Sequence, residues 1–174
     1  MAEQQQVQER FEAFVKPQLP VLFRLARSMA RELADAEEIV QETCLKAFRA
    51  FHQLRPGSDA RAWLITILLN TYRDWVRQTL RRPQTVHFDD LITWPQAFQD
   101  PEDITVQTQL GHLVRLALDD LPPDFRFAVL LADVEGFTYK EIAAIMGCPV
   151  GTVMSRLYRG RHLLQATLRA VLEE

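Results

Sequence analysis

The residues best suited to chemistry lie in one stretch near the C-terminal end, GCPVGTVMSRLYRGR, which contains three arginines and no acidic residue. The whole chain, in contrast, has a formal net charge of -3 at pH 7. A guanidinium can donate two parallel hydrogen bonds to a phosphate or to a guanine edge, and a hydroxyl can bond to either. This stretch therefore predicts contacts with DNA, although an arginine-rich helix that only faces solvent is the plain alternative. The candidate side chains are Thr152, Met154, Ser155, Arg156, Arg159 and Arg161.

Two short helices and a turn must position these side chains. The segment TYKE, residues 138–141, has the pattern of a capping box, and Gly147 can adopt the left-handed conformation that ends the helix it begins. A second helix is expected from about Pro149, with Val153 and Leu157 facing inward. This spacing is typical of a helix-turn-helix, whose second helix enters the DNA major groove.

The charged residues are unevenly distributed along the chain. Arginines outnumber acids between residues 55 and 82, whereas acids outnumber a single arginine between residues 86 and 124. Arginines dominate again after residue 149. Two basic regions separated by an acidic connector suggest that the protein touches one long polyanion at two places.

The apolar residues recur at three- and four-residue steps through most of the chain, and no stretch alternates cleanly with period two. We therefore predict an all-α fold of two small helical domains, residues 1–82 and 105–174, joined by an acidic flexible linker, residues 83–104. Three aromatic residues in the linker either contact a neighbouring molecule or pack on the flanking domains. They are Phe88, Trp94 and Phe98.

Prolines and capping residues predict where the helices begin and break. The first helical stretch is expected to break at Pro17 and Pro20. Asp35 is the expected N-cap of the next helix, and Ser58 or Asp59 that of the third. Besides the helix-turn-helix pair, the expected helices cover about 7–33, 35–53, 60–80, 105–119 and 123–134.

Several other classes of protein fit the sequence poorly. Cys44 and Cys148 are far apart with no CxxC motif, so we expect two buried thiols and neither a disulfide nor a metal site. The four histidines are scattered and no nucleophile or phosphate-loop motif is present, so we expect no enzyme and no cofactor. No segment approaches about 20 consecutive apolar residues, and the N-terminus is polar and acidic, so a cytoplasmic protein without membrane insertion is expected.

Three segments together resemble the extracytoplasmic-function (ECF) sigma factors of bacterial RNA polymerase, over nearly the whole chain. DAEEIVQETCLKAFRAF is similar to the polymerase-binding helix of that family and RPGSDARAWLITILLNTYRDWVRQ to its promoter-melting segment. LPPDFRFAVLLADVEGFTYKEIAAIMGCPVGTVMSRLYRGR is similar to its fourth region. The resemblance implies a dissociable initiation factor with sigma regions 2 and 4. The implied partners are the core polymerase, through its β' clamp helices and β flap, promoter DNA and an anti-sigma factor, and a stress response is the implied setting.

The resemblance also assigns roles to individual positions. For docking on the clamp helices these are Glu38, Gln41 and Glu42. For minus-ten recognition and melting they are Arg55, Ser58, Asp59, Ala60, Arg61, Asn70, Arg73, Asp74 and Arg77. The minus-thirty-five contacts coincide with the arginine-rich stretch. Many relatives carry Lys or Arg at the position of Met154, so an apolar contact, for example to a thymine methyl, is expected to replace one positive contact there.

Two alternatives to a sigma factor remain open from the sequence. A sigma mimic would use the same folds to sequester an anti-sigma protein without touching a promoter, and the intact arginines of the last helix count against it. An ordinary helix-turn-helix repressor would bind operator DNA as a dimer, but it would have no need of the docking and melting motifs.

Overall fold

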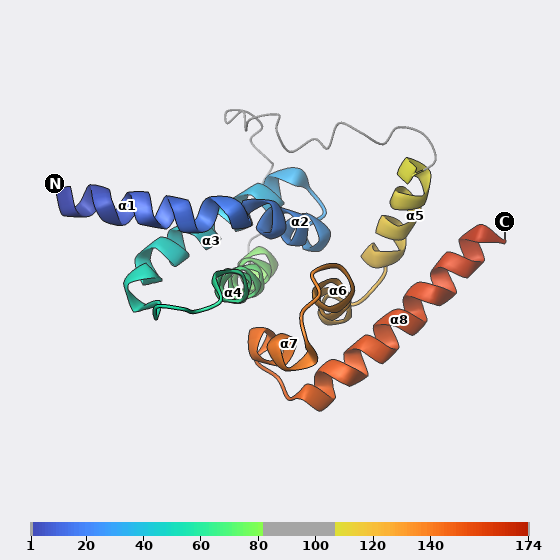
Figure 1. The fold of residues 1–174 in the computed structure, drawn as a ribbon. Coiled ribbons are helices and arrows are strands. Elements are labelled where there is room, and N and C mark those ends of the chain that lie inside the picture. The colour runs from blue at the N-terminus through green and yellow to red at the C-terminus, as the bar shows by residue number, and fades with distance from the viewer. Residues whose placement is uncertain (1, 82–106, 174) are drawn as a thin grey trace.

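The computed structural model describes residues 2–81 and 107–173, and every regular element within these two ranges is helical, which confirms the predicted all-α fold (Figure 1). The first half contains α1 (Ala2–Val15), the 3-10 helix η1 (Lys16–Gln18), α2 (Leu19–Met29), α3 (Leu33–Ala50), the 3-10 helix η2 (Phe51–Gln53) and α4 (Ala60–Arg81). The second half contains α5 (Gln107–Asp119), α6 (Pro123–Val129), the π-helical turn η4 (Leu130–Val134), α7 (Tyr139–Met146) and α8 (Val150–Leu172).

The first helical stretch breaks at its prolines, as predicted. Pro17 lies in η1, and Pro20 lies in the first turn of α2, where a missing backbone N–H leaves no hydrogen bond unmade. α1 buries Phe11 and Val15 at its C-terminal end, whereas its N-terminal end projects beyond the other helices (Figure 1). The packing of the first half therefore begins in the second part of α1.

The N-cap predicted for α3 is wrong. The helix begins at Leu33, and its N-cap is Glu32, which has an extended backbone with φ -96° and ψ 146°. The carbonyl of Glu32 accepts the N–H of Ala36 at 3.2 Å, which makes the first hydrogen bond of the helix. Asp35 lies inside the first turn instead, where the helix dipole still favours its negative charge.

Asp59 caps α4, which confirms one of the two predicted capping residues. Its Oδ1 accepts the backbone N–H of Arg61 at 3.0 Å and that of Ala62 at 3.2 Å. Gly57, with φ 82°, makes the preceding turn, because a side chain would be strained in that conformation. The cap therefore fixes where α4 starts, and with it the direction in which Arg61 leaves the helix.

The helix predicted from 123 to 134 changes its winding part of the way along. α6 begins at Pro123 as expected, but from Leu130 it continues as the π-helical turn η4. The chain then turns at Gly136, with φ 71°, and the N–H of Phe137 bonds to the carbonyl of Leu131 at 2.9 Å. This turn brings Glu135 and Phe137 into the interior of the molecule, where they are 6% and 7% exposed.

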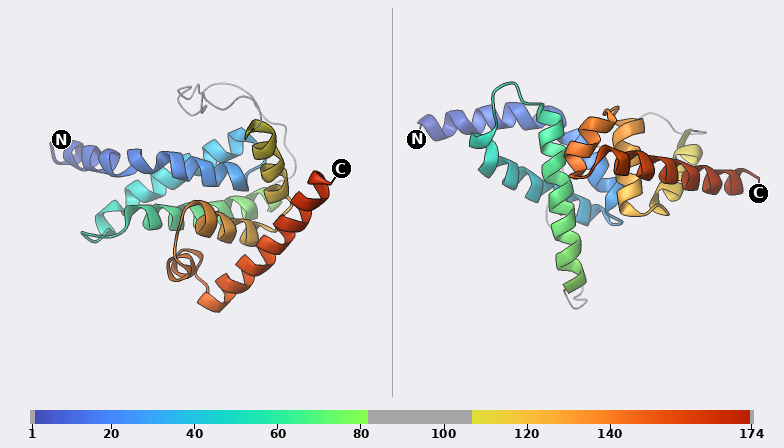
Figure 2. Two further views of the ribbon diagram at one scale, coloured as in Figure 1. Left: turned by 45° about the vertical axis from the view of Figure 1, so that its right-hand side comes forward. Right: turned by 90° about the horizontal axis from the view of Figure 1, so that it is seen from below.

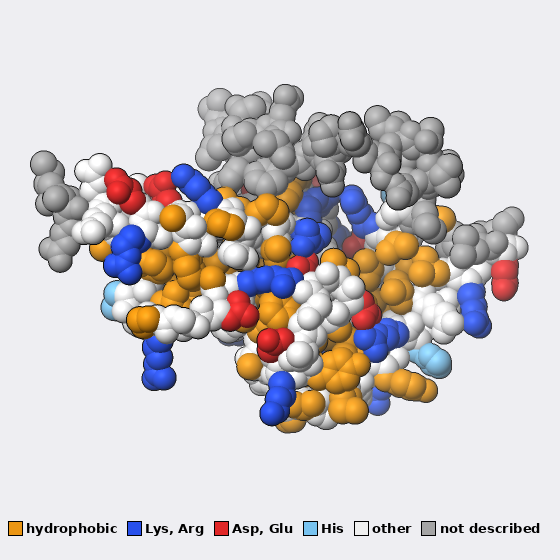
Figure 3. Space-filling view, in the orientation of Figure 1, with side chains coloured by type: hydrophobic (Ala, Val, Ile, Leu, Met, Phe, Trp, Pro, Cys, Tyr) orange, Lys and Arg blue, Asp and Glu red, His pale blue; other side chains and the backbone are white. Residues whose placement is uncertain are grey.

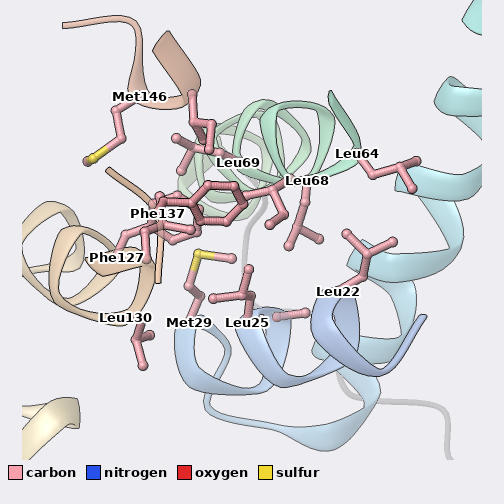
Figure 4. Close-up of a cluster of buried hydrophobic side chains, with 14 of the residues drawn as sticks. Leu22, Leu25, Met29, Leu64, Leu68, Leu69, Phe127, Leu130, Phe137 and Met146 are labelled. Carbon is pink, nitrogen blue, oxygen red and sulfur yellow. The ribbon is translucent and has the colours of Figure 1, made fainter. Parts of the chain in front are cut away.

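The two halves share one hydrophobic core. α7 packs against α4, and both α5 and α6 pack against α2. Figure 4 shows the centre of this core. Side chains from four helices and from the turn before α7 point toward one another there: Met29 of α2, Leu69 of α4, Phe127 of α6, Met146 of α7, and Phe137 of the turn. The views in Figure 2 agree in placing the second half directly against α2 and α4. The helical segments predicted as separate domains are therefore in direct contact.

The acidic linker predicted for residues 83–104, with its three aromatic residues, lies outside the residues that the structure describes. Within the described ranges, no helix combines the length and the apolar character needed to cross a lipid bilayer.

Candidate nucleic-acid interface

The predicted helix-turn-helix is present, and its local hydrogen bonds explain where it begins and ends. Thr138 is the N-cap of α7, and its hydroxyl accepts the N–H of Glu141 at 3.3 Å, while the Glu141 carboxylate accepts the N–H of Thr138 at 2.7 Å. This reciprocal pair is the predicted capping box. Gly147 ends α7 with φ 64° and ψ 41°, and the N–H of Cys148 bonds to the carbonyl of Ala143 at 3.1 Å.

The second helix of this unit, α8, presents one face to the core and one to solvent. Val153 and Leu157 are 0% and 2% exposed, which confirms their inward orientation. Met154 is 54% exposed, Ser155 is exposed and Thr152 is half-buried. The side chains predicted to contact DNA therefore lie on the accessible side of the helix or at its edge.

Gly160 allows α8 to approach α6 closely. A Cβ atom at this position would lie 2.9 Å from Cγ2 of Val129 and 3.4 Å from Cβ of Phe125. Val129 is buried and β-branched, so its methyl group has little freedom to move aside. The glycine thus fixes the distance between the arginine-bearing helix and the core of the second half.

The three arginines of α8 that are predicted to contact DNA have different surroundings. The guanidinium of Arg156 is 3.0 Å from Oδ2 of Asp124 and donates toward Sγ of Cys148 at 3.8 Å. Arg161 donates two hydrogen bonds to Asp133, which raise the pKa of the guanidinium above its ordinary value. Arg159 is exposed and pairs with no acid among the described residues, so it is the one most available to a phosphate or a base edge.

Most of the predicted minus-ten residues are exposed or have partners within the first half. Arg55, Ser58, Asn70 and Arg77 are exposed, and Ala60 is half-buried. Asp59 caps α4, and Asp74 pairs with Lys46 at 3.1 Å and with Arg77 at 3.8 Å.

Arg61 and Arg73 are the predicted minus-ten residues that contact the second half. Nη2 of Arg61 donates to the backbone carbonyl and to Oε2 of Glu135, both at 2.6 Å, and the guanidinium lies 4.5 Å from the ring centre of Phe137. Nη2 of Arg73 donates to the carbonyl of Met146 at 3.3 Å. The face of α4 that carries predicted DNA contacts is thus partly covered by the second half.

The predicted polymerase-docking residues do lie together. Glu38, Gln41 and Glu42 line a groove of about 320 Å³ between α3 and α4. The same groove contains Leu45, which is 51% exposed although it is a large apolar side chain. Leu45 was not among the predicted docking residues, all of which are polar.

Glu135 and Arg24 were also missed. The carboxylate of Glu135 is almost fully buried. Its partners, Arg24 and Arg61, are 111 and 74 positions away along the chain. No local pattern marks such a residue, because its role depends on a contact between the two halves.

Figure 3 shows the charged side chains on one face of the molecule. On that face, Lys and Arg side chains lie beside acidic ones and do not form one continuous basic patch.

Cys44 and Cys148 are free thiols, as expected, but both are half-buried where full burial was predicted. Partial burial raises the pKa of the Cys44 thiol, because the thiolate loses solvation. Among residues 2–81 and 107–173, no three His, Cys, Asp or Glu side chains are arranged to bind a metal ion.

The fold and the interface define an all-α protein in which a helix-turn-helix half packs on a second helical half. Residues 14–82 match the family model of Sigma-70 region 2, and residues 112–164 match that of Sigma-70, region 4. The ECF RNA polymerase sigma-E factor of Salmonella typhimurium is 34% identical over 137 residues, which are 75% of this chain and 72% of the relative. The chain therefore belongs to the family of ECF RNA polymerase sigma factors, which confirms the resemblance seen in the sequence.

A second relative and two solved structures extend this comparison. The ECF RNA polymerase sigma factor SigE of Mycolicibacterium smegmatis is 39% identical over 144 residues, 83% of this chain, and the chain spans only 56% of that relative's length. The sigma factor RpoE in complex with the anti-sigma factor NepR from Bartonella quintana superposes with a TM-score of 0.74 at 31% identity, over 92% of this chain and 98% of that one. CnrH in complex with the cytosolic domain of CnrY superposes with a TM-score of 0.67 at 27% identity. This match covers 94% of this chain and 90% of that one.

Proposed function

We propose that the chain binds the core of bacterial RNA polymerase and directs it to a specific set of promoters. The observation that carries this proposal is the exposed face of α8, which presents Arg159, Ser155 and Met154 to solvent while Val153 and Leu157 hold the helix in the core. A helix placed in this way fits the DNA major groove with its N-terminal residues at base edges. The second half is therefore assigned to the minus-thirty-five element.

The first half is assigned to polymerase docking and to the minus-ten element. The groove between α3 and α4 groups Glu38, Gln41 and Glu42 on one accessible face, as a docking surface requires. Arg55 and Ser58 are exposed in the turn before α4, and Asn70 and Arg77 are exposed along it. Positive charge beside a turn that can receive an extruded base is what opening of a duplex requires.

An anti-sigma factor is the proposed regulatory partner, and the β flap of the polymerase is the proposed contact of the second half. The superposition with RpoE bound to NepR spans both halves of the chain, so the packed arrangement described above resembles that of a sigma factor held by its inhibitor. Two weakly binding halves on one chain would give useful affinity only when both engage the polymerase and the promoter together.

The proposal is tested by run-off transcription from a genomic fragment library with bacterial core polymerase, with and without the protein. New start sites should require the protein. Arg159→Ala should reduce their use by about tenfold or more, because a bidentate arginine contributes about 1–3 kcal/mol to base discrimination. Arg169→Ala is the matched control, since Arg169 is exposed on the same helix several turns away. If the protein produces no new transcript and does not bind core polymerase in a pull-down, the proposal is wrong, and sequestration of an anti-sigma protein becomes the better hypothesis.

A further inference from the structure

Glu135 bridges two arginines of the other half of the molecule. Its Oε1 is 2.7 Å from Nη2 and 2.9 Å from Nε of Arg24, and its Oε2 is 2.6 Å from Nη2 of Arg61. The side chain of Glu135 is only 2% exposed, whereas those of Arg24 and Arg61 are 50% and 33% exposed. One carboxylate is therefore held between two guanidinium groups at the edge of the seam between the halves.

The two arginines belong to the first half, and the carboxylate belongs to the second. Arg24 extends from α2 and Arg61 from the first turn of α4, so both lie on one rigid group of packed helices. When the halves separate, the ion pairs of both arginines with Glu135 are lost together. Two neighbouring guanidinium groups without this carboxylate form an anion-binding site whose fork geometry also fits a phosphate.

We propose that Arg24 and Arg61 form a phosphate-binding site for nucleic acid, which Glu135 occupies when the two halves are packed together. The proposal rests on the proposed function, because it takes promoter DNA as the natural source of the phosphate. It adds Arg24, which no motif marks, to the DNA-binding surface, and it makes Glu135 an internal competitor of DNA.

The position of the site favours nucleic acid as the ligand. Arg61 follows directly on the turn that carries Arg55 and Ser58, which are exposed. Arg73, about three turns further along α4, donates to the carbonyl of Met146, so the second half contacts α4 at two points along its length. A strand that bound both arginines of α4 would therefore displace Glu135 from Arg61 and the carbonyl of Met146 from Arg73. Binding of DNA there and packing of the halves exclude each other.

The test measures binding of a fluorescein-labelled single-stranded DNA oligonucleotide of mixed sequence to the full chain, over a range of salt concentrations. Glu135→Gln keeps the shape of the side chain and removes its charge. The affinity of this variant for the oligonucleotide should be at least about fivefold higher than that of the wild-type chain, which is a change typical of coupling between two sites. Adding Arg24→Gln to Glu135→Gln should abolish this gain. It should also make the slope of log affinity against log salt less negative by about 0.7, the value for one phosphate contact with a single strand.

Asp120→Asn is the matched control, because Asp120 is an exposed acid of the second half and its replacement changes the net charge equally. Helicity by circular dichroism shows that each variant is folded. The inference is overturned if Glu135→Gln binds no more tightly than Asp120→Asn, or if the gain persists after Arg24→Gln. Neither readout involves polymerase, so a failure here is distinct from a failure of run-off transcription, which would contradict the proposed function itself.

Discussion

Asp133 accepts two hydrogen bonds from Arg161, at 2.6 Å from Nη2 and 3.0 Å from Nε, and so ties the π-helical turn η4 to the middle of α8. Tyr139 adds a longer contact, at 3.5 Å between its hydroxyl and Nη1. Arg161 was predicted to contact DNA, but its guanidinium is already engaged within the second half. In the folded chain this pair helps to orient α8, and it leaves fewer N–H groups of Arg161 available for DNA than Arg159 has.

Removal of this pair is expected to lower stability only modestly. Both side chains are more than two-fifths exposed, at 45% and 42%, so water screens their attraction. Asp133→Asn and Arg161→Ala should each lower the free energy of unfolding by no more than about 1 kcal/mol, measured by urea denaturation. In run-off transcription Arg161→Ala should lose much less activity than Arg159→Ala. Equal losses would mean that Arg161 leaves Asp133 and binds DNA.

Gly160→Ala should destabilise the protein even though alanine favours helices. The new methyl group would lie 2.9 Å from Val129, and overpacking of this kind costs about 1–3 kcal/mol, against a gain of up to about 1 kcal/mol in helix propensity. The midpoint of thermal unfolding should therefore fall. Gly151→Ala is the control, because a Cβ atom there meets nothing within 4 Å, and its midpoint should stay the same or rise. Equal shifts in the two variants would rule out the close contact between α6 and α8.

Glu135→Gln should allow the two halves to separate. The neutral amide loses the charge that holds Arg24 and Arg61, so the packed form is expected to be less populated. The separation is measured by double electron–electron resonance between two spin labels. The labels are attached at Gln53→Cys and Gln165→Cys, two exposed positions in opposite halves. Every chain in this experiment carries Ser in place of Cys44 and Cys148. The distance distribution should broaden toward longer values in Glu135→Gln.

The control for that measurement is again Asp120→Asn, which should leave the distribution unchanged because Asp120 is exposed and pairs with neither Arg24 nor Arg61. A distribution that is identical in all three chains would show that apolar packing around Met29 and Phe137 holds the halves together without help from the charges.

The thiol of Cys44 should react slowly with iodoacetamide. Burial raises its pKa above the ordinary value of 9.0, so less reactive thiolate is present at pH 8 than in the unfolded chain. Peptide mass spectrometry should show faster alkylation of Cys44 after denaturation in urea. Because the folded state holds this proton more tightly than the unfolded state, stability should fall as the pH rises above about 9. Alkylation at the same rate in both states would contradict the burial.

The local features of the second half could be predicted because their causes are local. The capping box of Thr138 and Glu141 and the left-handed turn at Gly147 each depend on residues within a few positions of one another. The inward orientation of Val153 and Leu157 follows from helical spacing alone. The N-cap of α3 was predicted incorrectly, because Glu32 caps that helix through its backbone and without a side-chain hydrogen bond, so its residue type gives no signal.

The sequence alone determined the helices, the helix-turn-helix and the family, because caps, periodicity and motifs are encoded by neighbouring residues. Which charged side chains meet, in contrast, depends on contacts between distant segments. Arg61 and Glu135 are 74 positions apart, and Arg24 and Glu135 are 111 apart, so neither pair leaves a periodic or local signal. Their contact exists because the apolar faces of α2, α4, α6 and α7 combine into one core, and burial of that shared surface brings the three side chains together.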